Sequence, residues 1–431
     1  MTSLSRRFNF KEWRLPRIRW RTIAIFLAVL GPGIITANVD NDAGGITTYS
    51  LAGAQFGYQM LWVVVVITIS LIVVQEICAR MGAVTRKGLA DLIREEFGVR
   101  TTVFVLMCLI AADVGNTMAE FAGVAWACEV FGISKYISVP LAAIFVWWLV
   151  LYGNYKQVER VFLIACSIYL TYIVSGILAH PQWGEVLHAT LVPTFSFQKD
   201  YLIMFIGVVG TTIAPWMQFY IQSAVVEKGI DIRDYPYSKM DVILGCIMTD
   251  VVAWFIIVAC GATIFVHHIP IQTAKDAALA LQPLAGKYCS ILFAVGLLNA
   301  SIFSACILPL ATSYYVCEAF GFEAGIDRKY REAPVYYWLY SSMICIGAGF
   351  ILIPKINLVN ILLISQVVNG ILLPFILIYM LKLVNNKKLM GDYVNSPTFN
   401  VIAWITTIVM IALTLALVVV TILQALNIIP S

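Results

Sequence analysis

Charge is scarce in this sequence. Asp, Glu, Lys and Arg together make up 12% of its 431 residues, about half the share of an ordinary soluble domain. Histidine occurs only four times, and none of the ten cysteines stands in a CxxC pair. An enzyme or a thiolate metal site needs clustered nucleophiles, bases or ligands. The composition therefore argues against both, and we expect the cysteines to be small buried side chains.

Hydrophobic residues, by contrast, make up 61% of the chain, and the mean hydropathy is +0.88. Apolar runs of about twenty residues, the length that crosses the hydrocarbon core of a bilayer, recur along the whole chain. We predict an all-α polytopic membrane protein, with the lipid bilayer as its partner and short loops between its spans. The expected spans cover residues 22–50, 57–80, 101–131, 136–154, 158–179, 200–227, 240–266, 287–317, 335–353, 358–383 and 399–427.

The basic residues predict the orientation of these spans. With the N-terminus placed in the cytoplasm, 23 of the 28 Lys and Arg residues fall on the inner side, seven of them in an arm at residues 1–21. Such a bias is typical of cytoplasmic loops. We therefore expect a multi-pass protein of the cell (plasma) membrane with a cytoplasmic N-terminus. The net charge of +4 reflects this topology, and no nucleic acid partner is expected.

The first expected span is interrupted within 31-GPGIITANVDNDAGGITTYSLAGAQFGY-58. Asp40, Asn41, Asp42 and the Gly44–Gly45 pair fall where lipid would be deepest. An ionisable residue inside a membrane points to a functional site. A broken backbone at that depth is tolerated only where it lines a cavity or is buried in protein. The break therefore predicts a site.

The sixth expected span is interrupted in a similar way, within 207-GVVGTTIAPWMQFYIQSAVVEKG-229. Pro215 lies at mid-depth, where it lacks a backbone donor and clashes with the preceding turn. Because the two breaks are five spans apart, their helices cross in opposite directions, as an inverted repeat of five plus five helices requires. Unwound carbonyls and half-helix C-termini would then face one midplane site and attract a cation. The carboxylate of Asp42 strengthens that prediction.

Three stretches of the chain carry a family resemblance. Gly31-Pro32-Gly33, Asp42 and 52-AGAQFGY-58 have one characteristic spacing, and 75-QEICARMGAVTRKGLADLIREEFG-98 and 365-SQVVNGILLPFILIY-379 match further motifs. Over most of its length the chain resembles the Nramp divalent-metal transporters. The resemblance implies a LeuT-type fold of about 11 transmembrane helices, with helices 1 and 6 broken at the midplane. It implies a transporter rather than an enzyme, with no cofactor and with a divalent metal ion as substrate.

The same resemblance implies one transmembrane transporter domain over residues 1–431. Its parts are the first repeat at 22–179, the second, inverted repeat at 200–383 and an additional helix at 399–427. No obligate protein partner is expected.

The substrate motifs depart from the family. Its first broken helix reads Asp-Pro-Gly-Asn, whereas this chain has 42-DAGG-45, so the acid stays and the asparagine ligand becomes Gly45. Its sixth helix reads Met-Pro-His, whereas this chain, aligned on the proline, has 214-APW-216. The soft methionine sulfur, which favours transition metals, is lost, and Ala214 and Gly45 leave more space. The positions expected at the metal are Asp42, Thr211, Gln366, Asn41, Ala214 and Gly45.

Groups that could carry a proton are also fewer than in the family. Trp216 stands in place of the histidine, and Thr117 replaces an aspartate three residues before Glu120. The downstream match at 220-YIQS-223 is one residue out of step with Pro215, and that alternative register brings Met217 nearer the site. The residues expected to flank the site are Trp216, Met217, Asn369, Asp40, Thr117 and Glu120.

Two of the flanking acids have two interpretations each. Asp40 either attracts cations in an aqueous vestibule or caps the half-helix. Glu120 is either a gate or packing residue or a part of the ion path. The sequence alone does not choose between them.

An oxygen-rich, roomy site suits Mg²⁺, which dehydrates reluctantly and usually keeps several waters. In these features the chain resembles the Nramp-related magnesium transporter branch. We predict transport of Mg²⁺, and of Mn²⁺, by alternating access and without proton coupling. The alternative is a proton-coupled Mn²⁺/Fe²⁺ symporter of the Nramp type. An amino-acid transporter of the same fold would use half-helix N-termini to hold a carboxylate, and Asp42 argues against it.

Overall fold

The computed structural model describes residues 32–152, 166–325 and 328–425, and within these ranges the regular structure is helical, with no strand. The predicted basic arm, residues 22–31 of the first span and residues 158–165 of the fifth lie outside the described residues.

Two of the predicted spans are pairs of half-helices. The first consists of α2 (Pro32–Asp40) and α3 (Ala43–Phe56), and the sixth consists of α10 (Lys199–Thr212) and α11 (Pro215–Glu227). The other long helices are α4 (Leu61–Thr85), α5 (Leu89–Glu129), α6 (Lys135–Tyr152), α12 (Tyr235–Cys260), α15 (Cys289–Phe320), α16 (Pro334–Ile351), α17 (Leu358–Val384) and α19 (Pro397–Ala425).

The number of spans agrees with the prediction. In the described part of the chain, nine helical segments are long and apolar enough to cross a membrane. The α2–α3 pair and the short apolar helix Ser167–Leu178, which includes α8 (Leu170–Leu178), account for the first and fifth spans. Short helices between the spans are α9 (Trp183–Leu191), α13 (Ala274–Ala278), α14 (Gln282–Ala285) and α18 (Lys387–Met390).

The third predicted span lies within α5, which has a kink at Gly98, close to the expected start of the span. α5 starts at Leu89, twelve residues before the expected boundary at residue 101, and Gly98 inside it has φ +81°. This positive φ bends the chain where a residue with a side chain would be strained. The segment before Gly98 is rich in charge, and the apolar span follows the kink.

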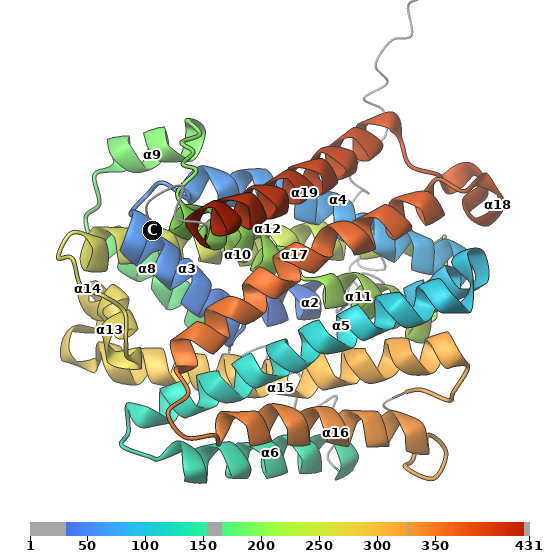
Figure 1. Ribbon diagram of the computed structural model, residues 1–431, viewed down its shortest axis with the longest axis horizontal. Coiled ribbons are helices and arrows are strands. Elements are labelled where there is room, and N and C mark those ends of the chain that lie inside the picture. The colour runs from blue at the N-terminus through green and yellow to red at the C-terminus, as the bar shows by residue number, and fades with distance from the viewer. Residues whose placement is uncertain (1–31, 153–165, 326–327, 426–431) are drawn as a thin grey trace, which may run out of the picture.

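The long helices form two groups around the broken pairs. α12 packs against α2, α3 and α4, whereas α5 packs against α6, α15, α16 and α17. In Figure 1, α5, α15, α16 and α6 run side by side across the lower half, and the half-helices lie near the centre. Both breaks are thus enclosed by helices from the two groups, as backbone interrupted inside a membrane requires.

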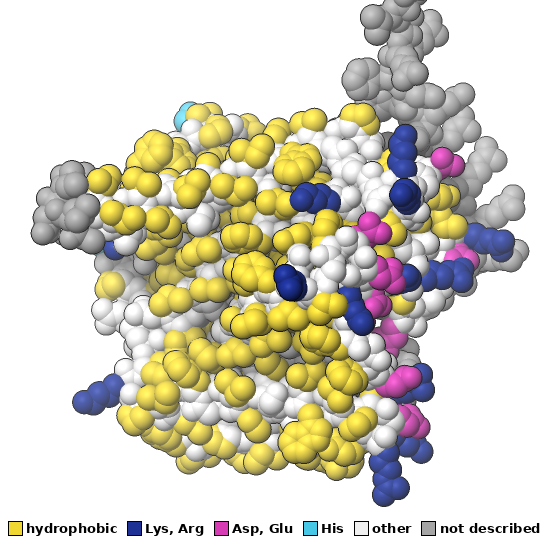
Figure 2. Space-filling view, turned by 45° about the vertical axis from the view of Figure 1, so that its right-hand side comes forward, with side chains coloured by type: hydrophobic (Ala, Val, Ile, Leu, Met, Phe, Trp, Pro, Cys, Tyr) yellow, Lys and Arg dark blue, Asp and Glu magenta, His cyan; other side chains and the backbone are white. Residues whose placement is uncertain are grey.

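The surface carries a broad apolar face. Exposed hydrophobic side chains are frequent on the outer sides of α6 and α19, for example Ile144, Trp148, Ile405 and Ile408. In Figure 2 hydrophobic side chains cover most of the visible body, whereas Lys, Arg, Asp and Glu gather mainly at its right-hand end. This distribution fits a body surrounded by lipid with one strongly charged end.

Candidate metal centre

The break in the first span is held open by Asp42. α2 ends at Asp40, and Asp42 is the N-cap of α3 in extended conformation. Its Oδ1 accepts a hydrogen bond of 2.6 Å from the backbone N–H of Gly45. A side-chain oxygen at this position satisfies an amide that the helix leaves without a partner. The carboxylate is therefore fixed at the first turn of α3, and it is 5% exposed.

The break in the sixth span is set by Pro215. α10 ends at Thr212, and Ala214 is the extended N-cap before Pro215 at the first position of α11. Proline is well tolerated there because its missing N–H would have had no partner within the helix. Ala214 is thus placed in the gap between the half-helices, as the alignment on Pro215 predicts, and is 2% exposed.

The two breaks meet at Gly44 and Gly45. A methyl group added to Gly45 would lie 3.2 Å from Thr211 Oγ1 and 3.4 Å from Asp42 Oδ1. One added to Gly44 would lie 1.9 Å from Gln366 Nε2. The first turn of α3 is therefore surrounded by side chains of Asp42, of Thr211 on α10 and of Gln366 on α17. These three predicted ligand positions come together from three helices.

The space expected beside Gly45 is already filled. A methyl group on Gly45 would lie only 2.5 Å from the carbonyl oxygen of Asp40. Glycine at this position therefore permits a close approach of backbone instead of leaving an open chamber. The approaching group is the carbonyl at the C-terminus of α2, where the helix dipole places partial negative charge.

The side chains of Asn41 and Asp40 turn towards α12. Asn41 Nδ2 donates to Thr249 Oγ1 at 2.7 Å, and Thr249 Oγ1 donates to Asp40 Oδ2 at 3.4 Å. Asn41 Oδ1, Asp40 Oδ1 and both carboxylate oxygens of Asp250 are buried without a hydrogen-bond partner among the described residues. Sequence reasoning missed Thr249, because nothing in the chain indicates which face of α12 meets the break.

Glu120 brings a second carboxylate to the break. Its Oε2 accepts a hydrogen bond of 3.5 Å from the backbone N–H of Ala43, the residue after Asp42. Thr117, on the same helix, is not brought to the break. Its hydroxyl donates to the Asp113 carbonyl at 2.7 Å, and its methyl group lies where a side chain on Gly347 of α16 would stand.

A buried polar network lies behind Gln366. It contains Asp113 and Asn116 on α5, Thr312 and Tyr315 on α15, and Asn369 on α17. Asn369, predicted to flank the site, donates to Gln366 Oε1 at 3.0 Å. Asn116, Thr312 and Tyr315 were not predicted. The spacing of Asp113, Asn116 and Glu120 puts the three on one face of a helix, which is the one signal in the sequence that could have found Asn116.

The two predicted residues of α11 are both buried. Trp216 is 2% exposed, and its ring packs against that of Tyr220 at 5.9 Å. Met217 lines a small void of about 10 Å³ together with Asp40 and Gln75. Met217 thus lies on the α2 side of the break.

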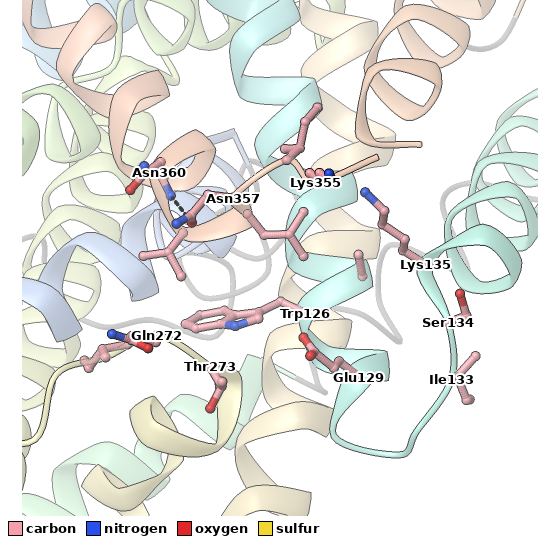
Figure 3. A pocket seen from close by; sticks show the side chains of 15 residues that line it. Trp126, Glu129, Ile133, Ser134, Lys135, Gln272, Thr273, Lys355, Asn357 and Asn360 are labelled. Atoms are coloured by element: carbon pink, nitrogen blue, oxygen red, sulfur yellow. Dashed lines mark hydrogen bonds between the residues drawn. The ribbon is translucent and has the colours of Figure 1, made fainter. Parts of the chain in front are cut away.

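A much larger cavity, of about 800 Å³, lies at the end of the molecule that contains the α5–α6 connection. The end of α5, the start of α6, residues 271–273 and the start of α17 line it. Figure 3 shows the Trp126 ring between the Gln272–Thr273 segment and Asn357. Trp126 is six residues beyond Glu120, which is about 9 Å along a helix. The cavity therefore lies on the side of the candidate centre where α5 ends.

The arrangement is suited to a hard cation. No group of three or more His, Cys, Asp and Glu side chains that could hold a metal ion occurs within the described ranges. A cation at the break would instead meet the Asp42 carboxylate, the Thr211 hydroxyl, backbone carbonyls and, once its amide turns, the oxygen of Gln366. Oxygen donors of this kind suit Mg²⁺, Ca²⁺ and Mn²⁺.

Comparisons with known proteins agree with this geometry. A family model described as natural resistance-associated macrophage protein-like (Nramp) matches residues 33–420. The divalent metal cation transporter MntH of Deinococcus radiodurans is 25% identical over 409 residues, which cover 91% of this chain and 90% of that protein.

Solved structures show the same fold. A manganese transporter of Eremococcus coleocola, crystallised with an aromatic bis-isothiourea substituted compound, superposes with a TM-score of 0.77 at 21% identity, over 94% of this chain and 88% of that chain. Mhp1, a nucleobase-cation-symport-1 family transporter, gives a TM-score of 0.57 at 12% identity, over 90% of this chain and 92% of that chain. The predicted LeuT-type fold is thereby confirmed.

Proposed function

Because this chain belongs to the Nramp family, whose members are multi-pass divalent-metal transporters and not enzymes, we propose that it carries Mg²⁺, and Mn²⁺ as a second substrate. Transport proceeds by alternating access and without proton coupling. The family membership supplies the general activity, and the choice of ion rests on the donor atoms at the break.

One observation carries the choice of magnesium. The side chains that surround the first turn of α3 offer a carboxylate on Asp42, a hydroxyl on Thr211 and an amide on Gln366, with neither sulfur nor imidazole among them. Soft transition metals gain most from thioether and imidazole ligands. Mg²⁺ needs oxygen ligands and usually keeps part of its water shell. A donor set of oxygens alone therefore lowers the advantage of transition metals over Mg²⁺.

The half-helix ends favour a cation electrostatically. The C-termini of α2 and α10 direct carbonyl groups towards the gap, and each carries partial negative charge. The N-terminus of α3 carries the opposite charge, but the Asp42 carboxylate caps it. The summed field at the gap thus supports a positively charged substrate.

A second candidate function is supported by Glu120. Its Oε2 accepts from the backbone N–H of Ala43, one residue from Asp42, and both acids are buried; two neighbouring buried carboxyls favour sharing a proton. A divalent ion that binds Asp42 would displace such a proton. This proximity keeps the proton-coupled Mn²⁺/Fe²⁺ symporter as the competing proposal, and a measurement of proton flux separates the two.

We place the protein in the plasma membrane with a cytoplasmic N-terminus. The ends of α4, α11, α15 and α17 carry most of the described Lys and Arg residues, and the opposite end carries Lys135, Lys199, Lys275, Lys287 and Lys355. The positive-inside rule assigns the first end to the cytoplasm. By this assignment the large cavity opens to the outside. The two repeats, residues 22–179 and 200–383, and the additional helix, residues 399–427, form one transport unit.

The proposal is tested by uptake into proteoliposomes that contain a trapped metal-sensitive dye. Mg²⁺ and Mn²⁺ are added separately at equal concentrations, with Ca²⁺ as a comparison and empty liposomes as the control. We expect saturable Mg²⁺ uptake that Mn²⁺ inhibits by competition. Saturable Mn²⁺ uptake with Mg²⁺ at the level of empty liposomes would reject magnesium as a substrate.

A further inference from the structure

Asp113 is buried in α5 and lies away from the break, and the transport site just described gives it no role. We propose that Asp113 is a positioning residue, which orients the side-chain amide of Gln366 towards the metal through Asn116 and Asn369. The inference rests on the proposed function in one respect, namely that Gln366 contributes an oxygen to a divalent cation.

Three donors fix the Asp113 carboxylate. Its Oδ2 accepts from Thr312 Oγ1 and from Tyr315 OH, each at 2.9 Å. Its Oδ1 accepts from Asn116 Nδ2 at 3.3 Å. Asp113 and Asn116 are each 1% exposed, so water does not compete for these bonds. The carboxylate is thereby held at one end of the network.

An ionised carboxylate can only accept hydrogen bonds. Asn116 must therefore turn its NH₂ group towards Asp113, and its Oδ1 points the other way. That oxygen accepts from Asn369 Nδ2 at 2.9 Å, while Asn116 Nδ2 also reaches Asn369 Oδ1 at 3.2 Å. The two bonds between the amides fix the orientation of Asn369, whose Oδ1 keeps a second lone pair for another donor.

Gln366 carries the next side-chain amide of this network, and that amide has two possible orientations. In this structure its Oε1 accepts from Asn369 Nδ2, and its Nε2 faces Gly44 at the break. A cation requires the opposite orientation, because an amide binds a metal through its oxygen. Rotation of the amide by 180° turns Oε1 to the break, and Nε2 can then donate to Asn369 Oδ1.

Asp113 keeps available the hydrogen-bond acceptor that the metal-binding orientation needs. An acceptor at the far end keeps Asn116 and, through it, Asn369 oriented so that Asn369 Oδ1 can receive the turned Gln366 amide. An asparagine at position 113 could donate as well as accept, so the orientation of the network would no longer be fixed. Because Gln366 and Asn369 are also 1% exposed, a misdirected amide would find no water in compensation.

The test is a double-mutant cycle on purified, correctly inserted protein. Asp113→Asn, Gln366→Ala and the double variant are compared for the KM and the maximal rate of Mg²⁺ uptake, and for Mn²⁺ binding by calorimetry. Groups that orient a metal ligand commonly change metal affinity by about 10–100-fold, so we expect Asp113→Asn to raise the KM by about tenfold. In the Gln366→Ala background the same change should have no further effect on KM.

Two further variants complete the test, one as an alternative in case Asp113→Asn does not fold and one as a control. Asn116→Ala interrupts the network one step later and leaves Asp113 bound to Thr312 and Tyr315, and it should reproduce the rise in KM even if Asp113→Asn fails to fold. Ser313→Ala is the matched control, because this buried hydroxyl of α15 donates to the Pro309 carbonyl outside the network. We expect Ser313→Ala to leave the KM unchanged.

Multiplicative effects of Asp113→Asn and Gln366→Ala on KM would overturn the inference, as would an unchanged KM in both Asp113→Asn and Asn116→Ala. A failure of the proposed function can be told apart from a failure of this inference. If the wild-type protein carries Mn²⁺ but no Mg²⁺, the same cycle run with Mn²⁺ still decides whether Asp113 acts through Gln366.

Discussion

Asp42 combines two functions in one side chain. Its Oδ1 caps α3 through the Gly45 amide, and its charge faces the gap where the carbonyl ends of α2 and α10 also point. Capping contributes about 1 kcal/mol to the stability of a helix. The loss of one partner of a buried charge interaction costs about 3–5 kcal/mol. The second effect should therefore dominate transport.

We expect Asp42→Asn and Asp42→Ala both to reduce Mg²⁺ affinity by about 100-fold or more, which corresponds to the lost charge interaction. Asparagine is as good an N-cap as aspartate, so Asp42→Asn should keep the melting temperature while Asp42→Ala lowers it. Uptake and thermal unfolding of the purified variants measure the two effects separately. Near-normal Mg²⁺ flux through Asp42→Asn would remove the carboxylate from the centre of the proposal.

Ala214 is the second residue on which selectivity should depend. A methionine there adds a soft thioether to the gap between α10 and α11 and favours transition metals. We expect Ala214→Met to raise the ratio of Mn²⁺ to Mg²⁺ uptake by about tenfold, which one contact worth about 1.4 kcal/mol produces. Ala214→Leu has similar bulk without sulfur and serves as the control. An equal ratio in the Met and Leu variants would assign the effect to size alone.

At the scale of helices, the site depends on the close approach of α10 to α17. A methyl group on Gly210 would lie 2.1 Å from the backbone oxygen of Gln366, and one on Gly370 would lie 2.4 Å from the oxygen of Ile206. Small residues of this kind let two helices in a membrane approach closely. The contact sets Gln366 beside the end of α10, and thus next to the break.

We expect Gly210→Ala to destabilise the protein by about 1–3 kcal/mol, the usual cost of overpacking, although alanine favours a helix by about 1 kcal/mol over glycine. Gly349→Ala in α16 is the matched control, because a methyl group there meets no atom within 4 Å. Thermal unfolding in detergent measures both variants. A higher melting temperature for Gly210→Ala than for Gly349→Ala would show that the two helices are not in tight contact.

The broken helices could be predicted from the sequence, because Asp42, the glycines after it and Pro215 each mark a helix boundary by their own chemistry. The groups that fill the gap between the half-helices could not be predicted. The closeness of the Asp40 carbonyl to Gly45 depends on how α2 meets α3, which composition does not record. The network was missed for a similar reason: Asp113 and Thr312 are 199 positions apart, and helical periodicity shows a polar face without identifying the helix that it meets.

At the scale of the whole molecule, the two sides of the candidate centre differ. The cavity of about 800 Å³ approaches it from the end that bears Lys135 and Lys355, whereas the other side has a void of about 10 Å³, close to the smallest space that holds one water molecule. On that side Glu76 forms an ion pair with Arg80 at 3.3 Å and accepts a hydrogen bond from Tyr235, which joins α4 to α12. Of these two cavities, the wider one is accordingly on the side proposed to face the outside.

Cysteine labelling tests this asymmetry. Asn360→Cys lies in the large cavity and Gln75→Cys beside the small void. The experiment uses intact cells, and labelling of the native cysteines in the wild-type protein is subtracted as background. We expect a membrane-impermeant maleimide to label Asn360→Cys and to leave Gln75→Cys unlabelled. Equal labelling rates would mean that water reaches both sides of the break in this state.

The central claim, a divalent cation carried without a proton, is tested most directly by one measurement. Proteoliposomes with a trapped pH dye and a clamped membrane voltage are given inward gradients of Mg²⁺ or Mn²⁺, and metal uptake and internal pH are recorded together. We predict metal uptake with no change in internal pH, because all four histidines lie in the described residues and are exposed, and Thr117 is engaged elsewhere. A metal-dependent acidification that disappears in Glu120→Gln would contradict the account and would identify a proton-coupled transporter.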